Sequence, residues 1–190
     1  VLSGAVSPGD VVAIVGAGPI GLAAILTAKL FSPGHIVAID VNDTRLDAAR
    51  DFGADTVVNS RHEEPRQVLD RLSGGLGVDV AMEAVGSPGT FEQSVSLVRP
   101  GGHVANIGVH GAPATLHLEQ IWIRDLTITT GLVDTFSTPT LIGLIAKGKI
   151  DTAGMVTHRF TMDEFDSAYE VFSDAGQSGA LKVLVTAVGR

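Results

Sequence analysis

The sequence predicts an α/β protein built on a doubly wound, six-stranded parallel sheet, with a partial second unit formed by the C-terminal tail. Short apolar runs without alternation recur along much of the chain and are separated by helical segments. This pattern is typical of strands that are buried on both faces. Hydrophobic residues make up 45% of the chain and aromatic residues only 5%, so the core must be aliphatic. Right-handed crossovers leave few topologies for such a chain, and the doubly wound order is favoured.

Apolar runs and helical spacing give the order of the elements. The strands are expected at residues 11–15, 35–41, 55–59, 78–85, 103–109 and 126–133. The helices are expected at residues 20–30, 43–52, 63–72, 88–98, 118–124 and 139–147. Turn residues separate these elements, for example Ser32-Pro33-Gly34 after the first helix and residues 99–102 (RPGG) before the fifth strand. Residues 115–118 are expected to add a short edge strand.

The C-terminal tail does not continue this alternation. From residue 150 the pattern predicts a strand at 156–160, a helix at 163–173, a glycine-rich loop and a strand at 180–187. Met162-Asp163-Glu164 suits a helix start, because acidic side chains are favourable near the positive end of a helix. The tail is therefore expected to belong to a second structural unit.

The first strand leads into a glycine motif. In the sequence VVAIVGAGPIGL of residues 11–22, Gly16, Gly18 and Gly21 have the G-x-G-x-x-G spacing of a dinucleotide-binding turn. The first glycine permits a sharp exit from the strand, the second allows a pyrophosphate to approach the backbone, and the third permits close helix packing. Pro19 suits the first helical turn, where a missing N–H costs nothing. The helix N-terminus would offer amide groups to the phosphates.

An acidic residue supports this interpretation. Asp40 ends the second apolar run, 19 residues after Gly21, where a carboxylate can accept hydrogen bonds from both hydroxyls of an adenosine ribose. The alternatives are an ordinary βαβ unit with a tight turn, in which Asp40 is only a loop acid, and a methyltransferase, which also combines a glycine turn with an acid. The three-glycine spacing and the helix-opening proline favour a dinucleotide.

Composition excludes several classes of protein. The net charge of −8 and the pI near 5.1 argue against a nucleic acid or an anionic membrane as partner, since both require a basic surface. The chain has no cysteine, so it forms no disulfide and no thiolate metal site by itself. No apolar stretch reaches the length of a membrane span and no secretory signal is visible, so the expected location is cytoplasmic.

An ordered set of motifs identifies a family. Its segments are Pro8-Gly9-Asp10 before VVAIVGAGPIGL, Arg45-Leu46, Ala48-Ala49, Phe52-Gly53-Ala54-Asp55, VDVAMEAVGSPGTFEQSVSLVRPGGHVANIGVHG, IRDLTITTG and the final ALKVLV. In these segments the chain resembles the zinc-type alcohol dehydrogenases of the medium-chain dehydrogenase superfamily, and the resemblance covers essentially all 190 residues.

The resemblance implies an oxidoreductase that passes a hydride between an alcohol carbon and a nicotinamide. Residues 9–150 would form the NAD-binding Rossmann domain, and residues 1–8 and 151–190 would be remnants of the catalytic domain. The catalytic half, with its zinc ligands, precedes this region in the family, so zinc is expected only in the full-length protein. This chain would carry no catalytic residue and no metal ligand, and would be inactive alone.

The resemblance also assigns residues to the parts of the cofactor. Asp40 would bind the ribose and select NAD over NADP, because a carboxylate repels a 2′-phosphate, and Arg45 would stack on the adenine. The nicotinamide would be held mostly by backbone and aliphatic groups, which leaves one face of the ring for the substrate. The complete set of expected cofactor-binding residues is Gly16, Gly18, Pro19, Ile20, Gly21, Asp40, Val41, Arg45, Ala84, Val85, Gly86, Ile107, Gly108, Val109, Leu132 and Val133.

For a few residues the sequence is compatible with more than one role. Glu83 lies within an apolar strand, so its carboxylate should face the cofactor crevice or meet a polar group. His110 is either a proton relay or a structural residue. Residues 115–133, with Trp122, either pair across a two-fold axis, as in the family's dimers, or pack in the core. A non-catalytic NAD(H)-binding sensor or regulatory module fits the glycine turn equally well, although such a module has no need of the tail.

Overall fold

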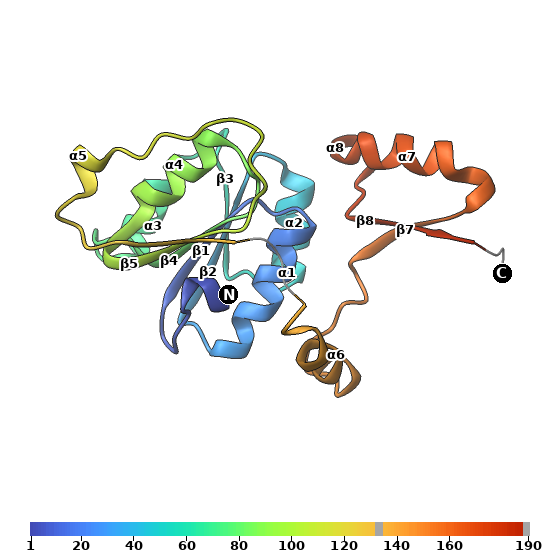
Figure 1. Cartoon of the computed structure of the whole chain (residues 1–190), viewed down its shortest axis with the longest axis horizontal. Helices are drawn as coiled ribbons and strands as arrows, with labels where there is room; N and C mark the ends of the chain where they lie inside the picture. The colour runs from blue at the N-terminus through green and yellow to red at the C-terminus, as the bar shows by residue number, and fades with distance from the viewer. Residues whose placement is uncertain (132–134, 188–190) are drawn as a thin grey trace. The chain divides into compact units, whose positions relative to one another are not determined.

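The computed structural model describes residues 1–131 and 135–187 (Figure 1). The chain divides into two compact units, Val1–Asp134 and Thr135–Arg190. The boundary between the two units therefore precedes residue 150, where the strand–helix pattern of the sequence changes. The helix α6 (Thr138–Ala146) consequently belongs to the second unit. The assignment of either part to a catalytic domain stays a prediction.

The first unit contains a parallel sheet of six strands within residues 1–131. The strands are β1 (Val11–Val15), β2 (His35–Asp40), β3 (Thr56–Asn59), β4 (Val78–Glu83), β5 (Val98–Asn106) and β6 (Thr127–Thr130). Their spatial order is β3-β2-β1-β4-β5-β6, and every neighbouring pair is parallel. The chain thus builds outward from β1 on one side and from β4 on the other, which confirms the predicted doubly wound sheet.

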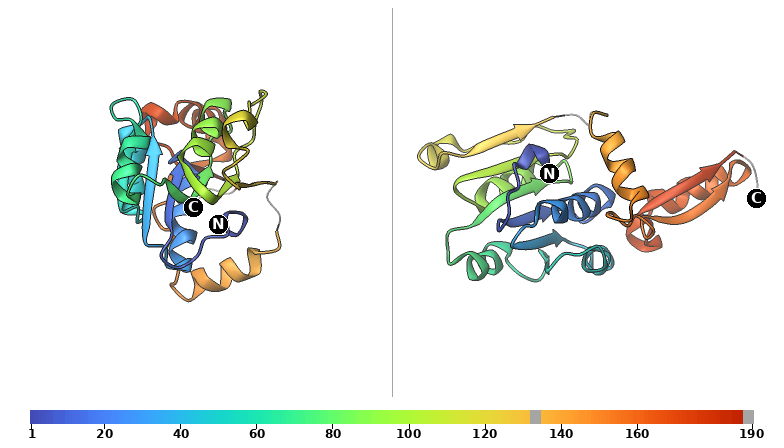
Figure 2. Two further views of the ribbon diagram at one scale, coloured as in Figure 1. Left: turned by 90° about the vertical axis from the view of Figure 1, so that its left-hand side faces the viewer. Right: turned by 90° about the horizontal axis from the view of Figure 1, so that it is seen from below.

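Helices connect these strands and cover both faces of the sheet (Figures 1 and 2). They are α1 (Pro19–Ala28), α2 (Asp43–Asp51), α3 (Pro65–Ser73), α4 (Pro88–Leu97) and the short α5 (Leu118–Ile121), with 3₁₀ turns at Leu2–Gly4 and Lys29–Phe31. Proline opens α1, α3 and α4, because the first helical N–H has no intrahelical partner. Side chains cap three of the starts: Asn42 accepts from the Arg45 amide, Glu64 from the Arg66 amide and Ser87 from the Thr90 amide.

Both faces of the central strands are buried, which explains the absence of alternation in the sequence. On one face Ala13, Val15, Val37 and Ile39 pack with residues of α3 and α4 in an aliphatic core. The intervening residues of β1 and β2 are also buried and point to the opposite face. There α1 and α2 contact the strands and each other.

Two local predictions are wrong. The sequence RPGG of residues 99–102 lies inside β5 rather than before it, and the pairing of β5 with β4 shifts register there, from Val78–Val98 to Val80–His103. Pro100 has no N–H and Gly101 has a φ of +73°, so these residues interrupt the ladder without ending the strand. Residues 115–118 form no edge strand in the described chain, because the Thr115 amide donates to the side chain of Glu92.

The second unit, considered by itself, contains a two-stranded parallel sheet. It comprises α6, β7 (Val156–Thr161), the 3₁₀ turn Met162–Glu164, α7 (Phe165–Ser173), α8 (Ala175–Ser178) and β8 (Lys182–Thr186). This is the predicted strand–helix–strand order, with a short helix within the glycine-containing loop. Among the residues described in the two units, no helix is long and apolar enough to cross a bilayer.

Candidate functional site

The carboxyl ends of β1 and β4 form the point at which the sheet changes direction. The chain leaves β1 toward β2, whereas it leaves β4 toward β5, so the two connections diverge (Figure 1). The residues that follow these strands are close together, since a Cβ built on Gly16 would lie 2.6 Å from Cγ2 of Val85. In open α/β sheets ligands bind at such a switch point.

The glycine motif forms the turn between β1 and α1. Gly16 has a φ of +98°, and its amide donates to the Ile39 carbonyl at 2.7 Å. A Cβ on Gly21 would lie 1.8 Å from the Gly16 carbonyl oxygen, so α1 packs directly on the turn. In contrast, a Cβ on Gly18 would meet no described atom within 4 Å. The packing therefore requires the first and third glycines, while the second leaves open space beside the backbone.

The N-terminus of α1 also faces this turn. Gly18 is the N-cap residue, and within the described chain no side chain caps the helix there. The first-turn N–H groups and the positive end of the helix dipole can therefore interact with an anion. The turn thus has the geometry and the charge that a diphosphate requires.

Asp40, at the end of β2, is joined to the turn by hydrogen bonds. Its Oδ2 accepts from the Ala17 amide at 2.7 Å, and its Oδ1 accepts from the amides of Val41 at 2.7 Å and Asn42 at 3.0 Å. The residue is 8% exposed. A carboxylate offers about four lone-pair positions, so three amides leave room for a further donor. Asp40 therefore positions the turn and retains the capacity to accept a ligand hydroxyl.

The segments that follow β4 and β5 (residues 84–86 and 107–109) lie against each other on the β4 side of the switch point. The Ala84 amide donates to the Val15 carbonyl at 2.8 Å, and the amides of Ile107 and Gly108 donate to the Glu83 carbonyl at 2.8 and 3.0 Å. A Cβ on Gly86 would lie 2.3 Å from the Val109 carbonyl oxygen. The predicted segments 84–86 and 107–109 are therefore brought together.

Apolar side chains at this edge of the sheet are exposed. Ile20 at the start of α1 is 47% exposed, Val41 after β2 is 46%, Val85 after β4 is 53% and Val109 after β5 is 81%. All four belong to the predicted cofactor-binding set. Arg45, half-buried in the first turn of α2, is another member of this set, whereas Leu132 and Val133 lie outside the described residues.

Beneath these exits lies a buried polar cluster. Glu83 is 0% exposed, and its Oε1 accepts from the amides of Val85 and Gly86 and from the Thr90 hydroxyl, each at 2.8 Å. Nε2 of His110 lies 2.8 Å from Oδ1 of Asn106 and 3.4 Å from Oε2 of Glu83. The expectation that Glu83 meets polar groups is confirmed. Sequence reasoning missed Thr90 and Asn106; the Ser87–Thr90 spacing of a capping box was the available signal for Thr90.

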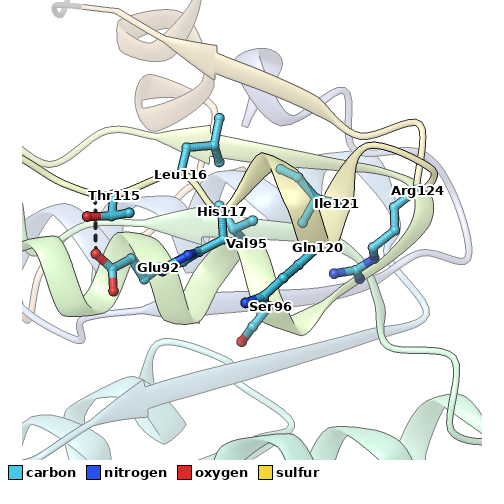
Figure 3. Close-up of a pocket in the computed structure, with 9 residues that line it drawn as sticks. All are labelled: Glu92, Val95, Ser96, Thr115, Leu116, His117, Gln120, Ile121 and Arg124. Atoms are coloured by element: carbon cyan, nitrogen blue, oxygen red, sulfur yellow. Dashed lines mark hydrogen bonds between the residues drawn. The ribbon is translucent and has the colours of Figure 1, made fainter.

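A small cavity lies elsewhere in this unit, between α4 and the segment that contains α5 (Figure 3). Its volume is about 170 Å³, below the roughly 300–1,000 Å³ of small-molecule sites. None of the described cofactor-binding candidates lines it. The structure also places no group of three His, Asp or Glu side chains at metal-binding distance within the described residues.

Comparison with known proteins supports the resemblance. A profile of the zinc-binding dehydrogenase family matches residues 19–147. The chain is 38% identical over 181 residues to an alcohol dehydrogenase of Cupriavidus necator, a match that covers 93% of this chain and 49% of that protein. It is 34% identical over 173 residues to an L-threonine 3-dehydrogenase of Anaeromyxobacter sp. strain K, covering 90% and 50%. The chain thus spans about half the length of the curated relatives it matches.

Solved structures agree with this comparison. The zinc-dependent alcohol dehydrogenase 2 of Streptococcus pneumoniae superposes with a TM-score of 0.95 at 44% identity, covering 100% of this chain and 55% of that one. A protein described as a short chain alcohol dehydrogenase, from Escherichia coli CFT073, was solved with NADH (TM-score 0.87, 26% identity, 96% and 54% coverage). A zinc-binding dehydrogenase from Sinorhizobium meliloti 1021 was solved with NADP (TM-score 0.84, 30% identity, 97% and 54% coverage).

Proposed function

The chain belongs to the zinc-binding dehydrogenase family, and on that premise we propose that it is the cofactor-binding part of an NAD-dependent alcohol dehydrogenase. The observation that carries this proposal is the open glycine turn at the switch point, with Asp40 bonded to it and exposed apolar side chains around it. A dinucleotide needs these three features together: a backbone surface for its diphosphate, an acceptor for its ribose and apolar cover for its rings.

Each part of the chain would bind a separate part of the cofactor. The backbone at Gly18 and the N-terminus of α1 would hold the diphosphate, and Asp40 would accept from the ribose hydroxyls. Because a carboxylate at this position repels a 2′-phosphate, we propose NAD rather than NADP. One structural neighbour was solved with NADH and another with NADP, so the proposed choice of NAD rests on Asp40.

The nicotinamide would lie over the exits of β4 and β5. Backbone groups of residues 107–109 would bind the carboxamide, while Val85 and Val109 would pack on the ring and exclude water from it. Bound NAD would supply the hydride acceptor for the oxidation of an alcohol. A ring held by aliphatic contacts on one face keeps its other face free for the substrate.

The remaining half of the site would come from residues beyond this chain. The described residues contain no metal-binding group, so we assign the zinc of the family to the half of the relatives that this chain does not span. The second unit supports this division, because an isolated two-stranded parallel sheet is marginal and such sheets are normally covered on both faces. We therefore propose that residues 151–190 complete a catalytic domain and that this chain alone has no turnover. A cytoplasmic location stays a prediction.

Binding of NADH to the 190-residue chain tests the cofactor assignment. We expect saturable binding with a micromolar dissociation constant, measured by calorimetry and by nicotinamide fluorescence, and no oxidation of alcohols. S-adenosylmethionine should not compete. Treatment with EDTA should leave both the affinity and the melting temperature unchanged, since the site needs no metal from this chain. Absence of heat with NADH at millimolar concentration would overturn the proposal.

We further propose that the segment 115–133 pairs two copies of the protein. Within the described sheet β6 is an edge strand, and an edge presents unpaired N–H and C=O groups to a second chain. Trp122 and Ile123, just before β6, are 75% and 72% exposed. A continuous edge with apolar side chains beside it suits a two-fold interface.

A further inference from the structure

The buried cluster at the carboxyl end of β4 contains two polar atoms that the proposed function does not explain. Among the described residues, Oε2 of Glu83 and Nδ1 of His110 are buried side-chain atoms without a hydrogen-bond partner. Burying a carboxylate is costly unless its partners compensate for the lost hydration. The other β4 residues facing the cores are apolar, so a carboxylate at this position requires a reason beyond packing.

The hydrogen-bond pattern fixes the hydrogen on His110. The Asn106 side-chain amide donates to the Gly108 carbonyl at 3.2 Å, which turns its Oδ1 toward Nε2 of His110 at 2.8 Å. An amide oxygen only accepts, so Nε2 must carry the hydrogen. The same nitrogen lies 3.4 Å from Oε2 of Glu83. The imidazole N–H is therefore directed toward both an amide oxygen and a buried carboxylate oxygen. The Phe91 ring packs against the imidazole in a T-shaped contact.

Glu83 contacts both backbone segments that form one end of the proposed site. Its Oε1 holds the amides of Val85 and Gly86, and its carbonyl holds those of Ile107 and Gly108. Its Oε2 lies against the second segment, because a Cβ on Gly108 would be 2.4 Å away. His110 then closes the second segment over Oε2. Glu83 thus links residues 84–86 to residues 107–110 through both its carboxylate and its main-chain carbonyl.

The cluster is remote from the ribose-binding acid. β1 separates β4 from β2 in the sheet, so Glu83 and Asp40 lie two strand spacings apart, about 10 Å. A change in the cluster should therefore affect the nicotinamide end of a dinucleotide and leave the adenosine end unaffected.

We infer that Glu83 and His110 form a buried acid–imidazole pair that positions the nicotinamide-binding backbone without touching the cofactor. The inference rests on the proposed function for the site, and it assigns a role to two side chains beneath it. Both are positioning residues. Replacing either should weaken recognition of the nicotinamide while recognition of ADP-ribose, the same molecule without the nicotinamide ring, is retained.

The experiment measures NADH and ADP-ribose binding by calorimetry for the 190-residue chain and for the Glu83→Gln and His110→Leu variants. Gln keeps the Oε1 acceptor but places an N–H group against the N–H of His110, and Leu removes the imidazole donor. We expect NADH affinity to fall about tenfold in each, because a buried polar group is left opposed or without its partner, and ADP-ribose affinity to change by less than about twofold. The blue shift of bound NADH fluorescence should also decrease.

Two further sets of variants make the result specific. His110→Gln keeps a donor near Nε2 and should recover most of the NADH affinity. Glu63→Gln and His62→Gln are matched controls on exposed residues of the same unit, and should bind both ligands as the parent chain does. The double variant Glu83→Gln/His110→Leu should lose less than the sum of the single losses, because the partners act as one pair.

The outcomes are distinguishable. If the parent chain binds neither ligand, the proposed function fails and the inference fails with it. If the parent chain binds both and the two variants match it, the inference alone is overturned. Equal losses for NADH and ADP-ribose would assign the pair to general stability and would also overturn it, as would additive losses in the double variant. ADP-ribose binding doubles as the check that each variant is folded.

Discussion

Asp40 accepts hydrogen bonds from the amides of Ala17, Val41 and Asn42, and under the proposed function the same carboxylate would also bind the ribose. The sequence placed an acid at the end of the second strand, and its position predicted a ligand contact. The hydrogen bonds to the glycine turn could not be predicted, since Ala17 and Asp40 meet only after β1 and β2 have paired. We therefore expect substitutions at Asp40 to change both cofactor choice and stability.

The double substitution Asp40→Gly with Val41→Arg should shift preference from NAD toward NADP. Removing the carboxylate removes its repulsion of a 2′-phosphate, and a guanidinium at the exposed position 41 supplies attraction. We expect the ratio of NADPH to NADH affinity to rise about tenfold or more, since a close charge pair near a protein surface contributes about 1–4 kcal/mol.

The same variant should be less stable by about 1–3 kcal/mol, the cost of leaving buried amides without an acceptor. Competitive titration with NADH and NADPH and a denaturant curve measure the two effects. Val41→Arg alone is the control, because it keeps the carboxylate and the turn. Unchanged selectivity for NAD in the double variant would show that Asp40 does not contact the ribose.

Alanine should lower NADH affinity at one glycine of the motif and folding stability at another. Gly18 has a φ of −73°, which alanine adopts readily, and a Cβ built on it would meet open space. The Gly18→Ala variant should therefore fold normally. Its NADH affinity should fall by about tenfold or more, because the added methyl group would fill the position of the diphosphate. Gly21→Ala places a Cβ 1.8 Å from the Gly16 carbonyl oxygen and should cost about 1–3 kcal/mol of stability by overpacking.

Thermal melts and NADH titrations separate these effects, and Gly143→Ala in α6, where a Cβ meets nothing within 4 Å, is the matched control. An unstable Gly18→Ala chain, or one that binds NADH with full affinity, would contradict this account of the turn.

At the scale of whole elements, local sequence signals account for most of what the structure contains. The strands of the sheet and its four longer helices occur where apolar runs, prolines and capping residues placed them, with ends that differ by a few residues. The exceptions are residues 99–102 and 115–118, whose structure depends on partners distant in sequence. Arg99 donates to Asp79 of β4 at 2.6 Å, and the Thr115 amide donates to Glu92 of α4, and neither contact can be deduced from the local pattern.

We expect the carboxylate of Glu164, just before α7, to make the stability of the second unit depend on pH. Oε2 of Glu164 accepts from the amide and the hydroxyl of Thr161, each at 2.9 Å, and the hydrogen bond from the Thr161 amide, followed by that from its hydroxyl, lowers the pKa of Glu164 below its ordinary value of 4.5. A lowered pKa means that the ionised group stabilises the folded unit above pH 4.5, and that this contribution is lost as the pH falls through the lower folded value.

Carbon-13 NMR of the Glu164 carboxyl, in the folded chain and in urea, measures both pKa values. Glu164→Gln keeps an acceptor for Thr161 but cannot ionise, so this contribution to the pH dependence of α7 should disappear in that variant. A folded pKa equal to the one in urea would show that the capping interaction does not form in solution.

At the scale of the whole molecule, exposed apolar groups remain in both units. In the second unit Phe165, Tyr169 and Phe172 follow one another along α7 with more than half of their surfaces exposed. In the first unit Trp122 and Ile123 flank the edge strand. Contiguous exposed apolar side chains are typical of surfaces that a partner covers, which accords with a chain that spans half of its relatives.

Oligomeric state tests the proposed pairing surface. Light scattering after gel filtration should show a dimer for the parent chain, and Ile123→Asp should shift it to monomer, because a charge would be buried at the interface without a partner. Ile142→Asp, on a 61% exposed residue of α6 outside the segment, should leave the dimer intact. A monomeric parent chain at high concentration, or a dimer that survives Ile123→Asp, would refute the pairing through residues 115–133.

The fold class, the order of the elements and the position of the glycine turn follow from residues close together in the chain: an apolar run, a proline at a helix start, a glycine that no side chain can replace. Which groups meet across the sheet depends instead on how the strands pair in the folded chain. The Ala17 amide donates to Asp40, the amides of Ile107 and Gly108 donate to the Glu83 carbonyl, and His110 approaches Glu83. These contacts arise from parallel strands whose carboxyl ends share one edge. That proximity is a property of strand pairing, and the linear order of the residues does not contain it.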